Sequence, residues 1–433
     1  MVEKEGVAPA MQRRTSLALF AVLGLLVVAA AGGALIRFER PDPAPRPAQL
    51  ISVIQEASVA VLPFVNMSGD PEREYFSDGI SGELRDALAD TQGVLVASRA
   101  SSFAFKGKNT NILDIARRLR VRTVLEGSVR DEGNRVRITA QLISAATGLH
   151  LWSQTYDRDL ADFPRLQNEI AASIARALTD RPVAEDTRSP KRVDPDAYRK
   201  YLQARNEFAR RSPAGMKRAL DLTNDVTRRA PDFVPGLALL ARASLWLAGT
   251  DRAALDDAVV PAEKALALDP ENAEARLVHL QLSLRRWDWR PATEDADHLL
   301  AANPNNAAAL YGLAYYYRHL GFPEKGYSYR AAAAWLDPSY DWRGEYVEST
   351  GSDDARAGLI AAHAGNPIDA LDQFERSYED RDIALTTVPY DPATPRTLMG
   401  DPRWKSLWQK PELKAWQQEH DRVASTLTAP ALR

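Results

Sequence analysis

The hydrophobic pattern of the chain begins with one long uncharged segment. Thr15 to Ile36 is a run of 22 residues, rich in Leu, Val and Ala, that contains no charged side chain. A helix needs about 20 apolar residues to cross the hydrocarbon core of a bilayer, so this segment predicts a transmembrane helix. A cleaved signal peptide is the alternative interpretation, but its apolar region is usually about 7–15 residues long.

The orientation of this segment in the membrane is inferred from the amount of chain on either side of it. Arginines flank both ends, so the positive-inside rule does not choose an orientation. Residues 1–14 are too few to fold, and we therefore expect a short cytoplasmic tail with every folded part outside the cytoplasm. Within residues 37–56, the segment from Pro41 to Pro47 alternates proline with small or polar residues, which predicts a stiff and extended spacer.

Residues 57–180 show the pattern of a small α/β domain. Short apolar runs alternate with segments whose apolar positions recur at the helical spacing i, i+3, i+4, i+7. In one segment Val136, Ile138, Ala140 and Leu142 alternate with polar residues, which predicts a strand with one buried face. The predicted order is β-α-β-α-β-β-β-α. The expected strands are 58–64, 94–97, 123–129, 135–143 and 149–156, and the expected helices cover 80–88, 112–119 and 166–178.

A second pattern follows residues 181–194, a charged and proline-containing stretch that predicts a linker. Prolines recur at the ends of predicted helices, at Pro231, Pro270, Pro304 and Pro338. Their spacings of 39, 34 and 34 residues fit the tetratricopeptide unit, a helical hairpin with a period of about 34 residues.

This spacing predicts a tetratricopeptide-type array of about five helical pairs over residues 195–380. Small residues such as Ala314 and Gly326 fall where two antiparallel helices must touch. Residues 381–433 then form a C-terminal capping segment, with one further helix expected from Asp401 to Trp416. A chain of 433 residues exceeds what one core usually supports, so the fold class is multidomain: a transmembrane helix, an α/β domain and an all-α solenoid.

Several blocks of the α/β region resemble the TolB-like amino-terminal domain family. They are SVAVLPFVNMSGDPEREYFSDGIS (58–81), SSFAFKGK (101–108), VLEGSVR (124–130), RVRITAQLI (135–143) and LWSQTYDRDL (151–160). The resemblance implies a periplasmic domain that often precedes tetratricopeptide repeats in sensors with a cytoplasmic nucleotide cyclase or winged-helix domain. Because 14 residues precede the predicted span, we expect that neither output domain is present.

Composition narrows the chemistry. A net charge of -3 gives no electrostatic footprint for nucleic acid, and the absence of cysteine excludes thiolate metal sites and cysteine nucleophiles. The six histidines are scattered, and no phosphate-binding glycine loop occurs. We therefore expect no enzyme activity, no cofactor and no metal.

The repeat array suggests a binding surface. In this repeat class the first helix of each pair lines a concave face, where Tyr311, Tyr315 and Arg318 are the candidate contacts for a partner. The alternative is that these tyrosines pack between repeats. The resulting hypothesis is a scaffold that binds a protein or peptide of the cell envelope. It would be anchored by a single span in a bacterial inner membrane, with its C-terminal domains in the periplasm.

Two other functions stay open. The chain is alternatively the sensory component of a transmembrane signalling system whose output domain is on another chain. An enzyme is the third and least favoured hypothesis, because the sequence offers no nucleophile with a neighbouring base and no metal cluster.

Overall fold

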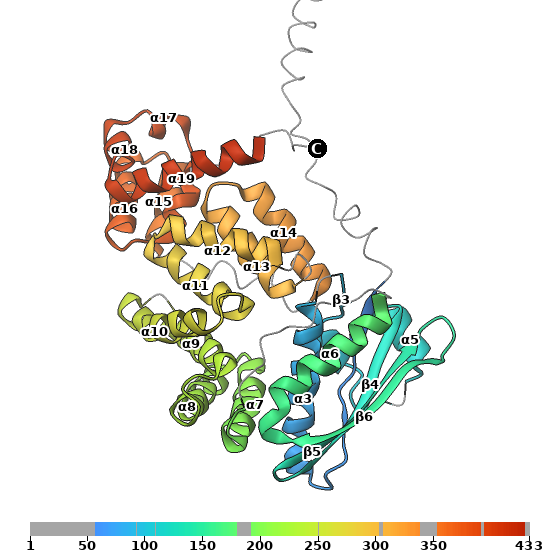
Figure 1. Ribbon diagram of the computed structural model, residues 1–433. Coiled ribbons are helices and arrows are strands. Elements are labelled where there is room, and N and C mark those ends of the chain that lie inside the picture. Colours follow the sequence, from blue (N-terminus) through green and yellow to red (C-terminus); the bar gives the residue numbers. More distant parts are fainter. Residues whose placement is uncertain are drawn as a thin grey trace, which may run out of the picture. The chain divides into compact units, whose positions relative to one another are not determined.

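The computed structural model describes residues 57–91, 93–108, 110–179, 192–249, 251–302, 306–337, 353–390 and 394–428 (Figure 1). All of them belong to one compact unit, Leu50–Arg433. The predicted tail (1–14), span (15–36) and spacer (37–56) lie outside the described residues, as does most of the predicted linker (181–194). Within the described ranges, none of the helices has the length and hydrophobicity that a membrane crossing requires.

The first part of the described chain is a mixed sheet with helices on both faces. The strands are β1 (Ser58–Val61), β2 (Val65–Asn66), β3 (Leu95–Val96), β4 (Thr123–Glu132), β5 (Arg135–Ser144) and β6 (His150–Asp159). Their order is β3-β1-β4-β5-β6, with β2 also paired to β4. β1 runs parallel to β3 and β4, whereas β4, β5 and β6 are antiparallel. A mixed sheet is therefore present, and it contains every strand that the sequence pattern predicted.

Helices complete this domain. They are α3 (Glu74–Ala89), α4 (Arg99–Phe103), α5 (Ile112–Leu119) and α6 (Phe163–Thr179), with short 3-10 turns at Pro71–Arg73 and Leu160–Asp162. The predicted order of elements is confirmed, and β2 and α4 are additions to it. Both are short, with two and five residues, which is below the length at which a hydrophobic period is recognisable.

The alternation predicted for β5 fixes the layers of the domain. Val136, Ile138, Ala140 and Leu142 are fully buried in one core together with residues of α3 and α6. Gly127 on β4 is required at this point, because an added Cβ would lie 2.2 Å from the Thr139 carbonyl oxygen. The opposite face of β5 is largely polar. On β4, however, Val124 faces this opposite side and packs in a second, smaller core with Ile115 and Ala116 of α5.

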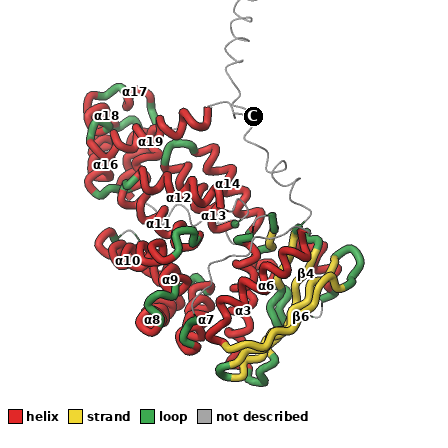
Figure 2. The backbone as a smooth tube through the Cα atoms, in the orientation of Figure 1, coloured by secondary structure: helices red, strands yellow, loops and turns green. Residues whose placement is uncertain are grey.

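The second part is an array of antiparallel helical hairpins (Figure 2). The pairs are α7 (Pro195–Ala209) with α8 (Pro213–Arg229), α9 (Val234–Ala248) with α10 (Arg252–Leu268), α11 (Ala273–Arg286) with α12 (Trp289–Ala302), α13 (Ala307–His319) with α14 (Pro323–Leu336), and α15 (Asp353–His363) with α16 (Pro367–Glu379). These are the five predicted pairs, and their spacing is that of tetratricopeptide-type repeats.

Local sequence explains where these helices begin and touch. Asp194, Ser212, Asn272 and Asn306 each accept a backbone N–H in the first turn of the helix that follows, which satisfies donors that the helix leaves open. The predicted contact between small residues is also present. A Cβ added to Gly326 would lie 2.8 Å from the Ala314 carbonyl oxygen, so the backbones of α13 and α14 approach too closely for a larger residue.

The C-terminal segment differs from the prediction. Instead of one helix from Asp401 to Trp416, the chain forms α18 (Pro402–Leu407) and α19 (Pro411–Thr428) after a 3-10 stretch (Ile383–Tyr390) and α17 (Arg396–Met399). Pro411 has no N–H to continue α18, so a new helix begins there. Trp404 and Trp408 are buried, and the Trp404 ring lies 5.8 Å from that of Phe374 on α16.

Candidate functional site

The three residues predicted to bind a partner lie on α13, the first helix of the fourth pair. Tyr315 is 4% exposed and its ring lies 4.4 Å from that of His319, so it belongs to the core between hairpins. Tyr311 and Arg318 are half-buried, and Tyr311 also packs against this core. Burial raises the pKa of the Tyr315 hydroxyl, which keeps it neutral. The structure therefore separates one core tyrosine from two residues at the surface, and their binding role stays a prediction.

The first hairpin of the array packs on the α/β domain. One hydrophobic core contains Ile80, Leu84 and Leu88 of α3 and also Tyr198, Leu202 and further residues of α7. The backbone of α3 lies close to α7 at Gly79, where an added Cβ would lie 3.0 Å from the Cβ of Leu202. The described residues on the two sides of the predicted linker therefore share apolar contacts.

A group of polar and charged residues lies within this contact, and we call Glu83, Asp86, Tyr201 and Arg205 the junction cluster. The Tyr201 hydroxyl donates to a Glu83 carboxylate oxygen at 3.0 Å. The Arg205 guanidinium forms ion pairs with both Glu83 and Asp86. One cation on α7 thus bridges two carboxylates on α3, one turn apart on the same helix face.

Burial and charge act in opposite directions on these carboxylates. Loss of hydration raises the pKa of Glu83, and Arg205 offsets part of this effect. Burial also acts to raise the pKa of Asp86, but the charges of Arg85 and Arg205 outweigh it and the pKa is lowered. Arg205 is therefore needed to hold a buried negative charge at this interface.

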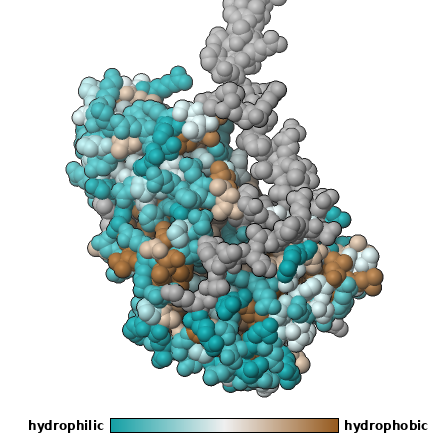
Figure 3. Space-filling model, in the orientation of Figure 1, coloured by the Kyte–Doolittle hydropathy of each residue, from teal (hydrophilic) through white to brown (hydrophobic). Residues whose placement is uncertain are grey.

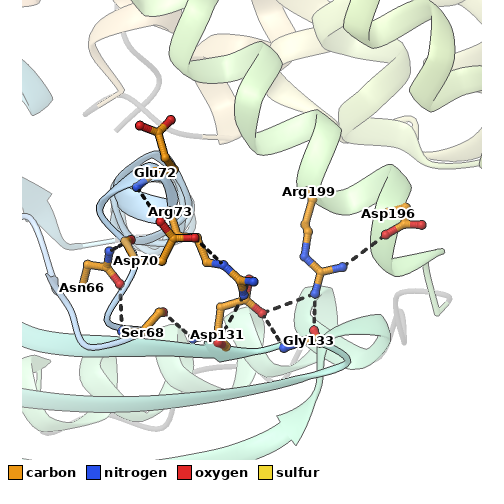
Figure 4. A network of polar contacts seen from close by, with 9 residues as sticks. All are labelled: Asn66, Ser68, Asp70, Glu72, Arg73, Asp131, Gly133, Asp196 and Arg199. Carbon is orange, nitrogen blue, oxygen red and sulfur yellow. Dashed lines mark hydrogen bonds and ion pairs between the residues drawn. The ribbon is translucent and has the colours of Figure 1, made fainter.

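A second network joins the same two parts at the β4–β5 turn (Figure 4). Asp131 has a side chain that is 3% exposed and accepts from Arg73 at 3.0 Å and from Arg199 of α7 at 3.3 Å. Arg199 also donates to the Gly133 carbonyl oxygen. The Ser68 hydroxyl accepts from the Asp131 amide at 2.9 Å. Two arginines from different parts of the chain therefore converge on one buried carboxylate.

A third contact reaches further along the array. Asn306 caps the start of α13 by accepting the amides of Ala308 and Ala309, while its side-chain amide donates to Asp90 at 3.1 Å. Asp90 directly follows α3. The end of α3 is thereby bonded to the residue that caps the helix carrying Tyr311.

These interactions hold surfaces together and do not form an arrangement that is typical of catalysis. In the part of the chain that the structure describes, no three His, Asp or Glu side chains are grouped to hold a metal ion. A hollow of about 420 Å³ lies at the turn side of the array, and it is lined by Ala253, Leu255, Asp256, Arg286, Asp288 and Arg381. Arg286 forms an ion pair with Asp256 there, so part of the charge is already matched within the chain.

The sequence patterns did not reveal the junction. Tyr198, Tyr201 and Arg205 stand at positions i, i+3 and i+7 of α7, which places them on one helix face. This spacing was the available signal, but it does not say which segment packs against that face. From the sequence, Glu83 and Asp86 are expected to be exposed, because charged residues on an amphipathic helix usually point to water.

Comparisons with known proteins give a partial likeness. No family model matches the chain. A curated relative, putative adenylate cyclase 3 of Rhizobium meliloti (strain 1021), is 36% identical over 250 residues. The match covers 56% of this chain and 42% of the relative, so the chain spans less than half of that protein's length.

Solved structures with similar parts include helical repeat proteins and a TolB protein. TTC0263, a thermophilic tetratricopeptide protein from Thermus thermophilus, matches with a TM-score of 0.29 and 17% identity over 46% of this chain and 98% of that one. MamA from Desulfovibrio magneticus gives 0.26 and 20%, over 44% and 97%. TolB from Acinetobacter baumannii gives 0.23 and 15%, over 30% and 29%. TM-scores of this size carry no argument about function.

Proposed function

We propose that this chain is a membrane-anchored scaffold that binds a protein or peptide partner through its helical array. The observation that carries the proposal is the array itself, with five stacked hairpins between Pro195 and Glu379. Stacked hairpins form extended surfaces that recognise other proteins. The apolar segment 15–36 supplies the anchor in this proposal, and the array would lie in the periplasm of a bacterium.

The contact between the α/β domain and the array supports a defined role for the former. A shared core and three polar contacts between the two parts favour movement as one body over independent motion. In the proposed scaffold the α/β domain therefore fixes the direction in which the array faces. A partner would meet a preset surface, which lowers the entropy that binding costs.

The binding surface is tested by comparing proteins captured from detergent-solubilised membranes. The variant Tyr311→Ala/Arg318→Ala changes the two half-buried residues of α13 and leaves the core residue Tyr315 in place. Tyr327→Ala is the matched control, because Tyr327 is 59% exposed on α14, the second helix of the same hairpin. We expect a partner that the wild type and the control capture and the double variant loses, while circular dichroism shows that the double variant is folded at the capture temperature. Identical partner lists from all three proteins would remove the groove from the proposal.

The location is tested separately with reporter fusions at the C-terminus. We expect a fusion to alkaline phosphatase to be active and a fusion to a fluorescent protein that folds in the cytoplasm to be dark. The reverse result would overturn the periplasmic assignment without affecting the binding surface.

One observation favours a second candidate, a sensory component whose output is on another chain. The relative that is 36% identical carries the name of a putative adenylate cyclase, which is a signalling enzyme. If the captured partner is a membrane protein with a cytoplasmic cyclase or DNA-binding domain, the sensory function gains over a passive scaffold. A partner confined to the envelope would favour the scaffold.

A further inference from the structure

One end of the sheet brings together the start of β1, the start of β4 and the β5–β6 turn. The Arg122 amide donates to the Ser58 hydroxyl at 3.0 Å, and the Ala145 amide donates to the Arg122 carbonyl oxygen at 2.8 Å. The Ser144 amide donates to the Leu149 carbonyl oxygen at 2.9 Å and closes the turn. The described chain enters the domain here, because β1 is its first strand.

This end exposes aliphatic side chains. Leu149 is 67% exposed and Leu151 is 52% exposed, and both belong to the turn and the first residues of β6. A hydrophobic patch over this end of the sheet, beside α5, is visible in Figure 3. Exposed large aliphatic residues side by side mark contact surfaces more often than single scattered ones do.

The same end is basic. Arg118 lies in the last turn of α5, and Arg120 and Arg122 connect α5 to β4. All three are exposed, and they form no ion pair with any residue that the structure describes. Nearby, Arg117 is paired with Asp114, so that pair adds no net charge. Three arginines that form no ion pair with a described residue therefore lie at the same end of the sheet as the two exposed leucines, and we call these five residues the basic end.

Arg120, one of these three arginines, has a left-handed backbone conformation. It ends α5 with φ 56 and ψ 40, in the left-handed region where glycine is the usual residue. Glycine would fit there without the Cβ penalty, so Arg120→Gly removes a charge from a site whose backbone already suits glycine.

We propose that the basic end docks on the surface of an anionic phospholipid bilayer. Exposed leucines and arginines at one end of a domain suit the boundary between headgroups and acyl chains, where both kinds of side chain are stabilised. The inference rests on the proposed anchor, because segment 15–36 and the spacer 37–56 lead directly to residue 57 at this end. An extended spacer of that length reaches at most about 60–70 Å, so the basic end is held near the bilayer at a high effective concentration.

The position of the tether and the charge of the basic end both favour an anionic bilayer as the binding partner of this surface. Residue 57, where the proposed tether joins the domain, lies at the basic end and not at the β4–β5 turn at the opposite end of the strands. Each arginine near an anionic surface is worth roughly a fivefold gain in binding, so three give on the order of 100-fold. The leucines add an attraction that salt does not screen.

The test uses the full chain reconstituted in lipid nanodiscs. The natural sequence contains no cysteine, so Ala146→Cys places a single environment-sensitive label in the exposed β5–β6 turn, and Asn134→Cys places it in the β4–β5 turn. Discs are made of phosphatidylcholine alone or with about one third phosphatidylglycerol, and a lipid-borne quencher reports contact. We expect quenching at position 146 on anionic discs, weaker quenching on neutral discs, and none at position 134.

Two variants separate docking from general charge. The equilibrium constant between docked and undocked states is read from quenching of the label at position 146. Arg118→Gln/Arg120→Gly/Arg122→Gln should lower this constant by about 100-fold, because three surface charges are lost. The control Arg158→Gln/Arg165→Gln/Arg176→Gln removes the same charge elsewhere on the domain and is expected to leave quenching unchanged. Equal effects of both variants would overturn the proposal.

The outcomes also distinguish the inference from the proposed function. A chain that does not co-elute with either type of disc would refute the membrane anchor itself. A chain that co-elutes while the label at position 146 stays unquenched on anionic discs would refute docking and leave the anchor intact. In that case an acidic protein would be the occupant that fits the same surface.

Discussion

Replacing Arg205 is the sharpest test of how the two described parts are held together. Arg205→Ala removes the cation that faces Glu83 and Asp86 and leaves Glu83, which is 4% exposed, with the Tyr201 hydroxyl as a neutral donor. Removing one partner of a buried ion pair typically costs about 3–5 kcal/mol. Because natural proteins are stable by about 5–15 kcal/mol, this loss is a large share of the total.

The pH dependence identifies the cause. Burial already raises the pKa of Glu83, and the loss of Arg205 raises it further. A carboxyl whose folded pKa lies above its unfolded pKa binds more protons in the folded state, so stability falls as pH rises through the folded value. The defect of Arg205→Ala is therefore expected to be smaller at pH 5 than at pH 8. Glu83→Gln/Arg205→Met, which removes both charges, is expected to recover most of the loss.

The assay is unfolding of the detergent-solubilised full chain in urea, which is neutral and does not screen ion pairs, followed by tryptophan fluorescence and circular dichroism. Arg218→Ala is the matched control. Arg218 is paired with Glu207 at 2.8 Å but its side chain is 51% exposed, so its loss is expected to cost at most about 1 kcal/mol. If Arg205→Ala costs no more than this control, or if its defect does not change with pH, the reasoning about the junction cluster is wrong.

Two further predictions follow from the packing and charge of single residues. In α3, Gly79→Ala is expected to destabilise the protein by about 1–2 kcal/mol, because the added Cβ meets Leu202. A Cβ added at Gly82 finds no atom within 4 Å, so Gly82→Ala is expected to stabilise the protein by about 0.5–1 kcal/mol. The urea midpoints of the two variants check this, and equal shifts would contradict it. The Asp295 carboxylate accepts a hydrogen bond from the His279 ring and raises the pKa of His279, so the stabilisation by His279 is complete below about pH 6.5 and is lost as pH rises through the folded value. His279→Gln should therefore lower the melting temperature more at pH 6 than at pH 8.5, and a larger loss at pH 8.5 would show that the sign is wrong.

Local patterns were sufficient for most elements of the fold. The alternation of Val136, Ile138, Ala140 and Leu142 identified a strand and its buried face, because side chains of a strand alternate between two sides. The proline spacing identified the hairpins, because proline cannot continue a helix. The prediction missed the helix break at Pro411 because the apolar periodicity continues across this residue. The inability of proline to continue a helix would have indicated the break.

The candidate binding residues show where periodicity is ambiguous. Tyr311, Tyr315 and Arg318 share one side of α13, which fits a groove and a core equally well from the sequence. The structure places the Tyr315 ring against His319 in the core, with Tyr311 and Arg318 nearer the surface. The depth of a side chain depends on the neighbouring hairpins, which periodicity along one helix does not contain.

The amino-acid sequence was enough to predict the type, order and apolar faces of most helices and strands, since these depend on residues at most one or two turns apart. Tertiary structure alone decided that Arg205 meets Glu83, a residue 122 positions away. The physical reason is that charged residues on an amphipathic helix have the same sequence pattern whether they face water or a partner. Their burial, and with it the shift in the Glu83 pKa, arises when α3 and α7 come together.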